Sequence, residues 1–485
     1  MHASTIEPRP ATTTINDMPD ELLREIFMWI NVYVNESMWT PEFREIAEPL
    51  LYHTFVTADI HTTLPAFLRR VIEQPRFARE LRYLDIGILR GEEFSGDSLR
   101  PYSKDDFAVL KAAAENIDYP RKEAWIKALS KGLADAELAL LLAHTPNLER
   151  INMEIWCQNE EELYTWVMIQ QAGPTVSNPT VHGFSALKSI SVAHGDTENG
   201  LELGFLIDFM RLPSLREIVG NACSWSFDDG TYDQPPAPQW PRDISNVENM
   251  AFTFSDFSDA ALANLIGACK ALKTFECHWG DAIIGASEFQ FPGLGRALMF
   301  QKDSLRTLSL DVSESYEVRD GNTPRPVGIG SLKDFRALTR LEISVVLLTG
   351  EEAMNAEDSD AGEELKRVNL ATILPPCLEE LILLDPVGHD DFSPFMDDLC
   401  MGVHEYLPAL RLIDTKQTSL PDSVRDRWKT RVQDTKIDFA VSHIASLFDS
   451  NPGQANETCG QCYPVQKRGL ALLNERLNFN DLRAS

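Results

Sequence analysis

The chain has 485 residues, roughly three times a typical domain of about 150 residues, so it forms either several domains or one elongated repeat array. Hydrophobic residues make up 44% of it and Gly and Pro are few (26 and 28), which excludes a disordered, collagen-like or low-complexity chain. With 44 basic and 74 acidic side chains the formal net charge is −30, which argues against nucleic acid and anionic membranes as partners.

Several features favour a cytoplasmic or nuclear location. Eight cysteines are scattered along the chain, which is typical of reduced thiols inside the cell. Residues 1–14 are rich in Thr and Pro, contain no apolar run of the kind found in secretory signals, and are expected to be disordered. No run of about 18 apolar residues occurs, so no membrane span is expected.

Residues 15–60 are expected to form a small helical module. Asp17 can cap a helix whose first turn contains Pro19 and two acidic residues, all favourable at a helix start. The apolar side chains that follow share one helix face at helical spacing: Leu22, Leu23, Ile26, Phe27 and Ile30. This pattern alone predicts an amphipathic helix, for example a cap that shields the first repeat of an array.

The order of residues from Met18 to Ile30 also resembles the opening of an F-box, the helical module that binds the Skp adaptor of cullin–RING ubiquitin ligases. Residues 43–52 resemble its closing helix in fungal members, and residues 64–84 are similar to the segment that leads into their repeats, so residues 61–80 are expected to be a linker helix. The resemblance implies a Skp-type adaptor and cullin complex as partners. The residues it implies for adaptor binding are Pro19, Glu21, Leu22, Leu23, Ile26, Phe27 and Ile30.

The middle of this module departs from the family pattern. Residues 31–42 contain Trp39 and Pro41 and show no Leu-rich helix. The departure leaves a second interpretation open, in which the F-box is degenerate and the chain has no ligase role.

A six-residue phrase with apolar residues at positions 1, 4 and 6 then recurs between residues 81 and 415. Its clear copies begin at Leu81, Leu148, Leu187, Val247, Leu272, Leu305, Leu338 and Leu378, and weaker copies begin at Leu215 and Leu410. Positions 4 and 6 fall on one face of a strand, and segments with helical spacing separate the copies. The interval of 67 residues after Leu81 is long enough to contain a further unit.

A helix, a turn and a short strand cannot bury their own apolar face, so such units are expected to stack into a curved solenoid. The phrase resembles a leucine-rich repeat with long, irregular, helix-containing units, although most copies lack the expected Asn or Cys after position 6. The predicted fold class is therefore α/β: a leucine-rich-repeat-like solenoid of alternating helices and short parallel strands over residues 81–415, preceded by the small all-α module. An ordinary α/β domain with buried parallel strands is the alternative.

Residues 416–485 are expected to form a helical cap and a tail, because a solenoid must cover its last apolar face. Val424, Trp428, Val432 and Phe439 supply apolar side chains for the cap. Further upstream, residues 351–364 contain seven acidic side chains and no basic one, which predicts a solvated insertion.

Residue patterns of known catalytic sites are missing. The sequence contains no Gly-x-Ser-x-Gly, His-Glu-x-x-His or Walker motif, and its one Cys-x-x-Cys pair, Cys459 and Cys462, has no second pair at zinc spacing. We therefore expect a non-catalytic protein without cofactor or metal.

The expected working surface is the concave face of the sheet, where positions 5 and 7 of the phrase point away from the core. Solvation alone would also place polar residues there. The candidate target-binding residues are Asp85, Asn152, Ser191, Thr253, Glu276, His278, Ser309, Asp311, Glu342 and Ser344. The sequence thus predicts a target-recognition subunit of a Skp–cullin–F-box ubiquitin ligase or, alternatively, a leucine-rich-repeat-like scaffold that binds proteins without a ligase.

Overall fold

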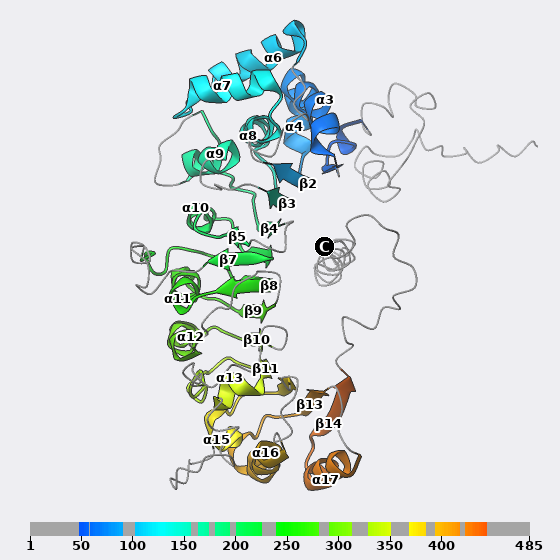
Figure 1. The fold of residues 1–485 in the computed structure, drawn as a ribbon, viewed down its shortest axis with the longest axis vertical. Helices are drawn as coiled ribbons and strands as arrows, with labels where there is room; N and C mark the ends of the chain where they lie inside the picture. Colours follow the sequence, from blue (N-terminus) through cyan, green and yellow to red (C-terminus); the bar gives the residue numbers. More distant parts are fainter. Residues whose placement is uncertain are drawn as a thin grey trace, which may run out of the picture.

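Short parallel strands alternate with helices along the chain (Figure 1). The structure is a computed structural model that describes residues 48–57, 59–90, 102–156, 163–173, 180–194, 200–225, 239–280, 291–312, 328–350, 368–384, 393–417 and 422–443. The strands are β1 (Thr54–Thr57), β2 (Tyr83–Arg90), β3 (Arg150–Trp156), β4 (Ser189–His194), β5 (Leu201–Glu202), β6 (Glu217–Asn221), β7 (Cys223–Trp225), β8 (Asn249–Phe257), β9 (Thr274–Trp279), β10 (Thr307–Asp311), β11 (Arg340–Ser344), β12 (Glu380–Leu384), β13 (Leu412–Gln417) and β14 (Asp438–His443). The helices are α3 (Ile60–Glu73), α4 (Pro75–Glu80), α6 (Lys104–Glu115), α7 (Lys122–Lys131), α8 (Ala134–His144), α9 (Tyr164–Ala172), α10 (Leu206–Met210), α11 (Asp259–Ala268), α12 (Phe291–Leu298), the 3₁₀ turn η5 (Met299–Gln301), α13 (Val345–Thr349), α15 (Leu370–Ile373), α16 (Ser393–Tyr406) and α17 (Asp422–Val432).

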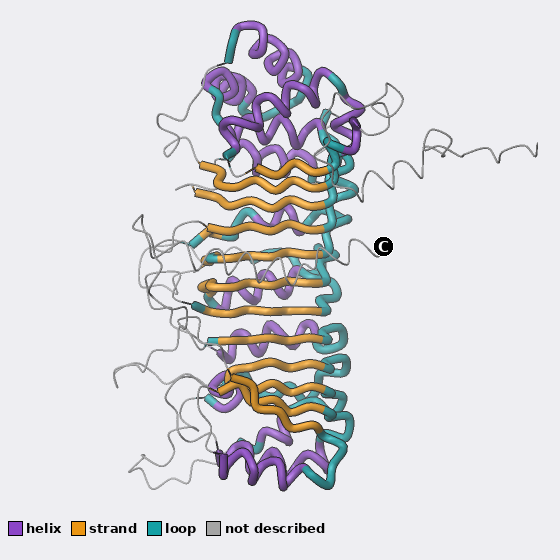
Figure 2. Tube along the Cα trace, turned by 90° about the vertical axis from the view of Figure 1, so that its right-hand side faces the viewer, coloured by secondary structure: helices purple, strands orange, loops and turns teal. Residues whose placement is uncertain are grey.

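In the described part of the chain, the strands form one 14-stranded sheet that follows chain order from β1 to β14, with β5 and β7 as a side branch next to β8. Neighbouring strands pair in parallel, for example β9 with β10 and β10 with β11. Figure 2 shows the strands as successive rungs, and in Figure 1 the stack curves with the strands on the inside and helices such as α9, α11 and α12 on the outside. This confirms the predicted solenoid, because a doubly wound α/β domain would reverse its strand order and cover both sheet faces with helices.

The apolar positions of the phrase build the core. Leu272, Phe275 and Cys277, at positions 1, 4 and 6 of one copy, are all fully buried. The weaker copies behave alike, since Leu215, Ile218 and Ile413 are also buried. Position 1 lies in the turn before the strand, so each unit contributes a buried side chain from its turn as well as two from its strand.

A backbone ladder in the same turns sets the register of the stack. The carbonyl oxygen at position 2 accepts two N–H groups from the next unit: Arg82 O accepts from Glu149 N at 2.8 Å and from Arg150 N at 3.0 Å. The pattern recurs up to Arg411 O, which accepts from Asp438 N at 2.8 Å. The carbonyl oxygen at position 2, which has no hydrogen-bond partner among the described residues of its own unit, is thereby paired with amides of the next unit.

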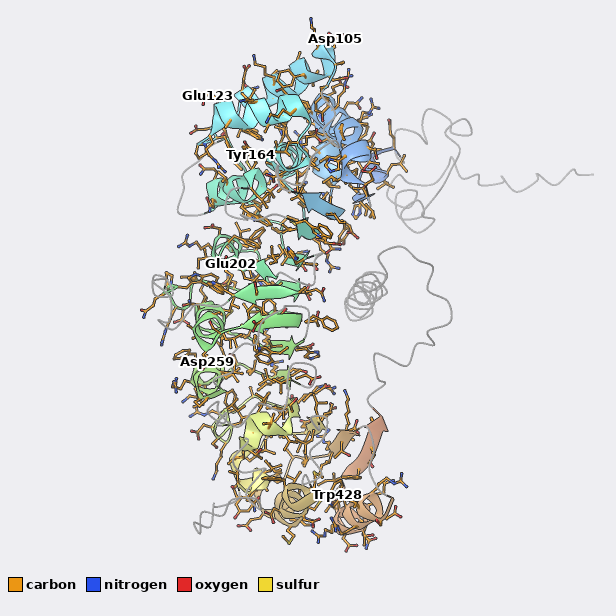
Figure 3. All side chains as sticks on the ribbon, viewed as in Figure 1. Asp105, Glu123, Tyr164, Glu202, Asp259 and Trp428 are labelled. Atoms are coloured by element: carbon orange, nitrogen blue, oxygen red, sulfur yellow. The ribbon has the colours of Figure 1, made fainter. Side chains whose placement is uncertain are left out.

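The helical layer is tied together by carboxylates, one buried and one half-buried, that reach from one unit to the next. The carboxylate of Asp135, on α8, accepts hydrogen bonds from Tyr164 N at 2.6 Å and from Thr165 N at 3.0 Å, and so caps the start of α9. Asp259, on α11 (Figure 3), lies against the start of α12, where a Cβ on Gly293 would overlap its carboxylate. Both carboxylates accept hydrogen bonds from amides that a helix start leaves unpaired, those of Gly293 and Leu294 in the case of Asp259.

The sheet extends beyond the predicted limits of 81 and 415. Strand β1 pairs with β2, so residues 54–57 belong to the sheet and not to the helical module predicted for residues 15–60. At the other end β14 pairs with β13, and Phe439, predicted to lie in a helical cap, is in this strand. The cap helix itself is present as α17, where Trp428 and Val432 are buried.

The segment around the first strand also differs from the prediction. The expected linker helix over residues 61–80 is two helices, α3 and α4, and α3 packs against β1, β2, α6 and α8 as part of the helical layer. Within the described residues of the 67-residue interval there is no further strand: β2 and β3 pair directly, and α6, α7 and α8 lie between them in the chain. The helices α6 to α8 therefore belong to a single long unit.

Candidate protein-binding surface

The concave face of the sheet carries the side chains at positions 3, 5 and 7, counted from the first residue of the phrase. These positions alternate along each strand with the buried positions 4 and 6. Position 5 forms one continuous row across the strands. Its members in strand order are Val56, Asp85, Asn152, Ser191, Val219, Ala251, Glu276, Ser309, Glu342, Ile382, Asp414 and Ala440. The register thus brings the predicted residues Asp85, Asn152, Ser191, Glu276, Ser309 and Glu342 into a single line.

Position 7 forms a second row, which contains the other predicted residues. His278 pairs in register with Asp311. The Nδ2 atom of Asn221 donates to Thr253 Oγ1 at 2.8 Å, and Ser344 Oγ donates to Asp311 Oδ1 at 3.2 Å. Irregularities at Gly87 in β2 and Phe254 in β8 shift the pairing beyond them, so this row is less even than the row at position 5.

A third row, at position 3, was missed by the sequence analysis. Its members are Thr54, Tyr83, Arg150, Ser189, Glu217, Asn249, Thr274, Thr307, Arg340, Glu380, Leu412 and Asp438. The signal for this row was available, since position 3 lies two residues before position 5 and so shares its face.

The predicted residues differ in how far a partner can reach them. Ser344 is fully buried at 0% exposure, with its Oγ atom also accepting from Val312 N at 3.1 Å, so its role is structural. Ser191 and Ser309 are buried as well. The predicted residues that stay partly exposed are Asp85, Asn152, Thr253, Glu276, His278 and Asp311.

Comparison with known proteins now adds the family. The leucine-rich repeat domain family matches residues 61–449. The chain belongs to the leucine-rich repeat family. A search of curated proteins finds no match.

A leucine-rich repeat domain implies protein partners, and here the concave face offers them two electrostatically different regions. On strands β11 to β13 four charged side chains form ion pairs: Lys416 Nζ lies 2.6 Å from Glu342 Oε1, and Arg340 contacts Glu342 and Glu380. Glu342 is only 8% exposed, so these cations offset the cost of burying its carboxylate.

From β2 to β10 the concave face of the leucine-rich repeat domain is acidic. At positions 3, 5 and 7 of these strands, among the side chains that the structure describes, the acidic ones are Asp85, Glu154, Glu217, Glu276 and Asp311 and the basic one is Arg150. Burial raises the pKa of Asp85, and the hydrogen bond from Asn152 Nδ2 at 2.9 Å partly offsets this. Burial likewise raises the pKa of Glu154, which accepts from Trp156 Nε1 at 3.0 Å. This region fits a partner with basic or hydrogen-bond-donating groups.

The remaining predicted site lies outside the described residues. All seven residues implied for adaptor binding, from Pro19 to Ile30, fall within residues 1–47. Among the described residues, none of the helices is long and apolar enough to cross a bilayer, and no group of three metal-ligating side chains occurs. The buried thiols of Cys223 and Cys269 have a raised pKa because of their burial, the opposite of an activated nucleophile.

Proposed function

We propose that this chain is the target-recognition subunit of a Skp–cullin–F-box ubiquitin ligase, acting in the cytoplasm or nucleus. The observation that carries the proposal is the F-box-like run from Met18 to Ile30, which stands ahead of a leucine-rich repeat domain matched over residues 61–449. The N-terminal run would bind the adaptor and the concave face would bind a protein target. The chain itself does no chemistry: it raises the effective concentration of the target beside the ligase.

A second candidate is a protein-binding scaffold without a ligase. Residues 31–42 favour it, because the F-box pattern expects a Leu-rich helix there and the sequence has none. Both candidates use the concave face to bind a protein, so they differ only in whether residues 18–30 bind the adaptor.

The deciding experiment is a binding titration of the purified full chain with purified Skp-type adaptor. The variant pair Leu23→Asp and Ile26→Asp places two charges on the apolar helix face, so the ligase proposal predicts loss of adaptor binding. The pair Arg24→Asp and Met28→Asp is the matched control, since both positions fall on the opposite face by helical spacing.

The ligase proposal requires that the control pair binds the adaptor as the unchanged chain does. If the unchanged chain fails to bind adaptor at micromolar concentration, the ligase role is refuted and the scaffold remains. Equal loss of binding in both variant pairs would show that the substitutions disturb folding and not an adaptor-binding face. This result would also count against the proposed contact.

A further inference from the structure

The turns before strands β6, β8, β9, β10 and β11 stack along one edge of the sheet (Figure 2). We call residues 213–216, 245–248, 269–273, 301–306 and 332–339 the basic edge. Its basic side chains are Arg216, Lys270, Lys273, Lys302, Arg306, Lys333 and Arg336, and its acidic ones are Glu248, Asp303 and Asp334. The whole chain holds 44 basic against 74 acidic side chains, so the basic edge reverses the charge balance of the protein.

Few of these cations are neutralised by a neighbour. Lys273 Nζ lies 2.6 Å from a carboxylate oxygen of Glu248, and Arg336 Nη1 lies 3.2 Å from one of Asp303. Within the described residues, the other five cations form no ion pair; Arg216 and Lys270 donate to neutral oxygen atoms instead. Because like charges along one edge repel one another, this arrangement favours an anion that bridges them.

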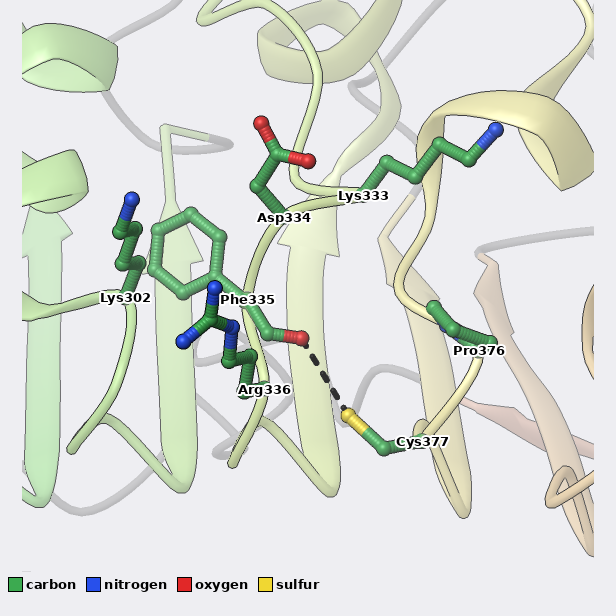
Figure 4. Close-up of a pocket in the computed structure, with 7 residues that line it drawn as sticks. All are labelled: Lys302, Lys333, Asp334, Phe335, Arg336, Pro376 and Cys377. Atoms are coloured by element: carbon green, nitrogen blue, oxygen red, sulfur yellow. Dashed lines mark hydrogen bonds between the residues drawn. The ribbon is translucent and has the colours of Figure 1, made fainter.

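A cavity of about 510 Å³ lies at the C-terminal end of the basic edge (Figure 4). Lys302 and Arg336 lie beside the ring of Phe335, and Lys333 lies on the other side of Asp334. The Arg336 side chain is 76% exposed although it pairs with Asp303, so it remains accessible from solvent. The thiol of Cys377 donates to Phe335 O and Leu338 O at 3.4 Å and so fixes the turn that carries these cations.

We propose that the basic edge binds an acidic segment of a protein partner, a run of Asp and Glu in extended conformation. Neighbouring strands lie about 4.8 Å apart, so the edge from β6 to β11 spans about 19 Å, the length of about six extended residues. A single small anion would contact only part of such a row. A nucleic acid is the poorer fit because its long, uniform charge would also meet the acidic surface of a chain with net charge −30. This surface is distinct from the concave face and does not depend on the proposed ligase role.

The test is a fluorescence-anisotropy titration of the full chain with a short labelled peptide of alternating Glu and Asp, compared with its Gln and Asn counterpart. We expect the acidic peptide to bind, the amide peptide not to bind, and the affinity to fall as salt rises from low to physiological. The variant Lys302→Gln, Lys333→Gln, Arg336→Gln should bind the acidic peptide about tenfold more weakly, from three exposed charge contacts.

The matched control removes three exposed lysines elsewhere: Lys104→Gln, Lys111→Gln, Lys127→Gln on α6 and α7. It lowers the net charge equally and should leave the affinity within about twofold of the unchanged chain. Equal weakening in both triple variants overturns the proposal, and so does tighter binding of a single-stranded oligonucleotide than of the acidic peptide. A second chain, with amides in place of the acidic side chains of residues 351–364, controls for competition by that acidic run. Failure of the peptide to bind either chain also overturns the proposal.

Discussion

The side chain of Gln301 provides a sharp test of how neighbouring units hold each other. It is 2% exposed and makes four hydrogen bonds, three of which reach the preceding unit. Its Oε1 atom accepts from Leu272 N and Ser304 Oγ, each at 3.0 Å, and its Nε2 atom donates to Ile266 O at 3.0 Å and Cys269 O at 2.8 Å. Gln301→Leu keeps the volume but removes all four bonds.

The cost follows from the groups left without a partner. Ile266 O still accepts from Cys269 N at 3.2 Å, so the main losses are at Leu272 N and Cys269 O. A buried polar group without a hydrogen bond costs about 1–3 kcal/mol, so we expect the loss of partners for these two groups to lower the unfolding free energy by about 2–6 kcal/mol. Urea unfolding followed by tryptophan fluorescence measures this loss, and hydrogen exchange of the Leu272 amide reports it locally.

Gln433→Leu, at an exposed position after α17, is the control for the same change of residue type. It should alter the unfolding free energy by less than about 0.5 kcal/mol. If Gln301→Leu costs no more than this control, or leaves the Leu272 amide as protected as before, the bridging role of Gln301 is refuted.

Three further changes test other parts of the fold. Gly295→Ala should destabilise the chain by about 3 kcal/mol or more in urea unfolding, because the new Cβ would lie 1.8 Å from Ile329 O and force the backbone apart. Burial raises the pKa of Glu137 from 4.5 to about 7, so its contribution to the unfolding free energy is full below pH 4.5, where Glu137 is protonated, and falls by about 3 kcal/mol as the pH rises to about 7. Glu137→Gln keeps an acceptor for the Tyr102 hydroxyl and should abolish this loss when urea unfolding is measured at several pH values. An unchanged pH dependence in the variant would contradict the prediction. Trp428, on α17, is fully buried (Figure 3), so Trp428→Ala should lower the unfolding free energy by about 3–5 kcal/mol. The variant should exchange amide hydrogens faster in β14 while β2 stays protected, and equally faster exchange in both strands would contradict the prediction.

The sequence predicts the middle of the solenoid well because each inner unit needs the same buried side chains. The prediction is wrong at the two ends of the sheet, because an end strand pairs with only one neighbour and its unit does not need the full set of buried side chains. Strand β1 has Phe55 at position 4 but Thr57 at position 6, and β14 is preceded by Lys436 at position 1, so neither matches the phrase. Helical spacing over residues 133–144 predicts α8, the last of the three helices before β3. The other two, α6 and α7, were missed, because they lengthen one unit without adding a strand.

For the candidate site, the period of two predicts which residues share the concave face, and the register confirms the row at position 5. The period of two does not predict how far each of these side chains is exposed to solvent. Ser344 follows the same period as Asp311, yet it is fully buried because its hydroxyl is used by Val312 N and Asp311. The basic edge went unnoticed because its cations are spread over more than a hundred residues of sequence and meet only when the turns stack.

The central claim is that two separate surfaces of one chain bind two proteins, and quantitative affinity purification with mass spectrometry tests it most directly. Three full-length chains are compared: the unchanged one, the pair Leu23→Asp and Ile26→Asp, and a concave-face pair on β9, Thr274→Arg and Glu276→Arg. The account predicts that the first pair loses the adaptor together with the cullin complex and keeps the target proteins, while the β9 pair keeps the adaptor and the cullin complex and loses target proteins. Identical partner sets for all three chains, or joint loss of the adaptor and the target proteins in either variant, would contradict it.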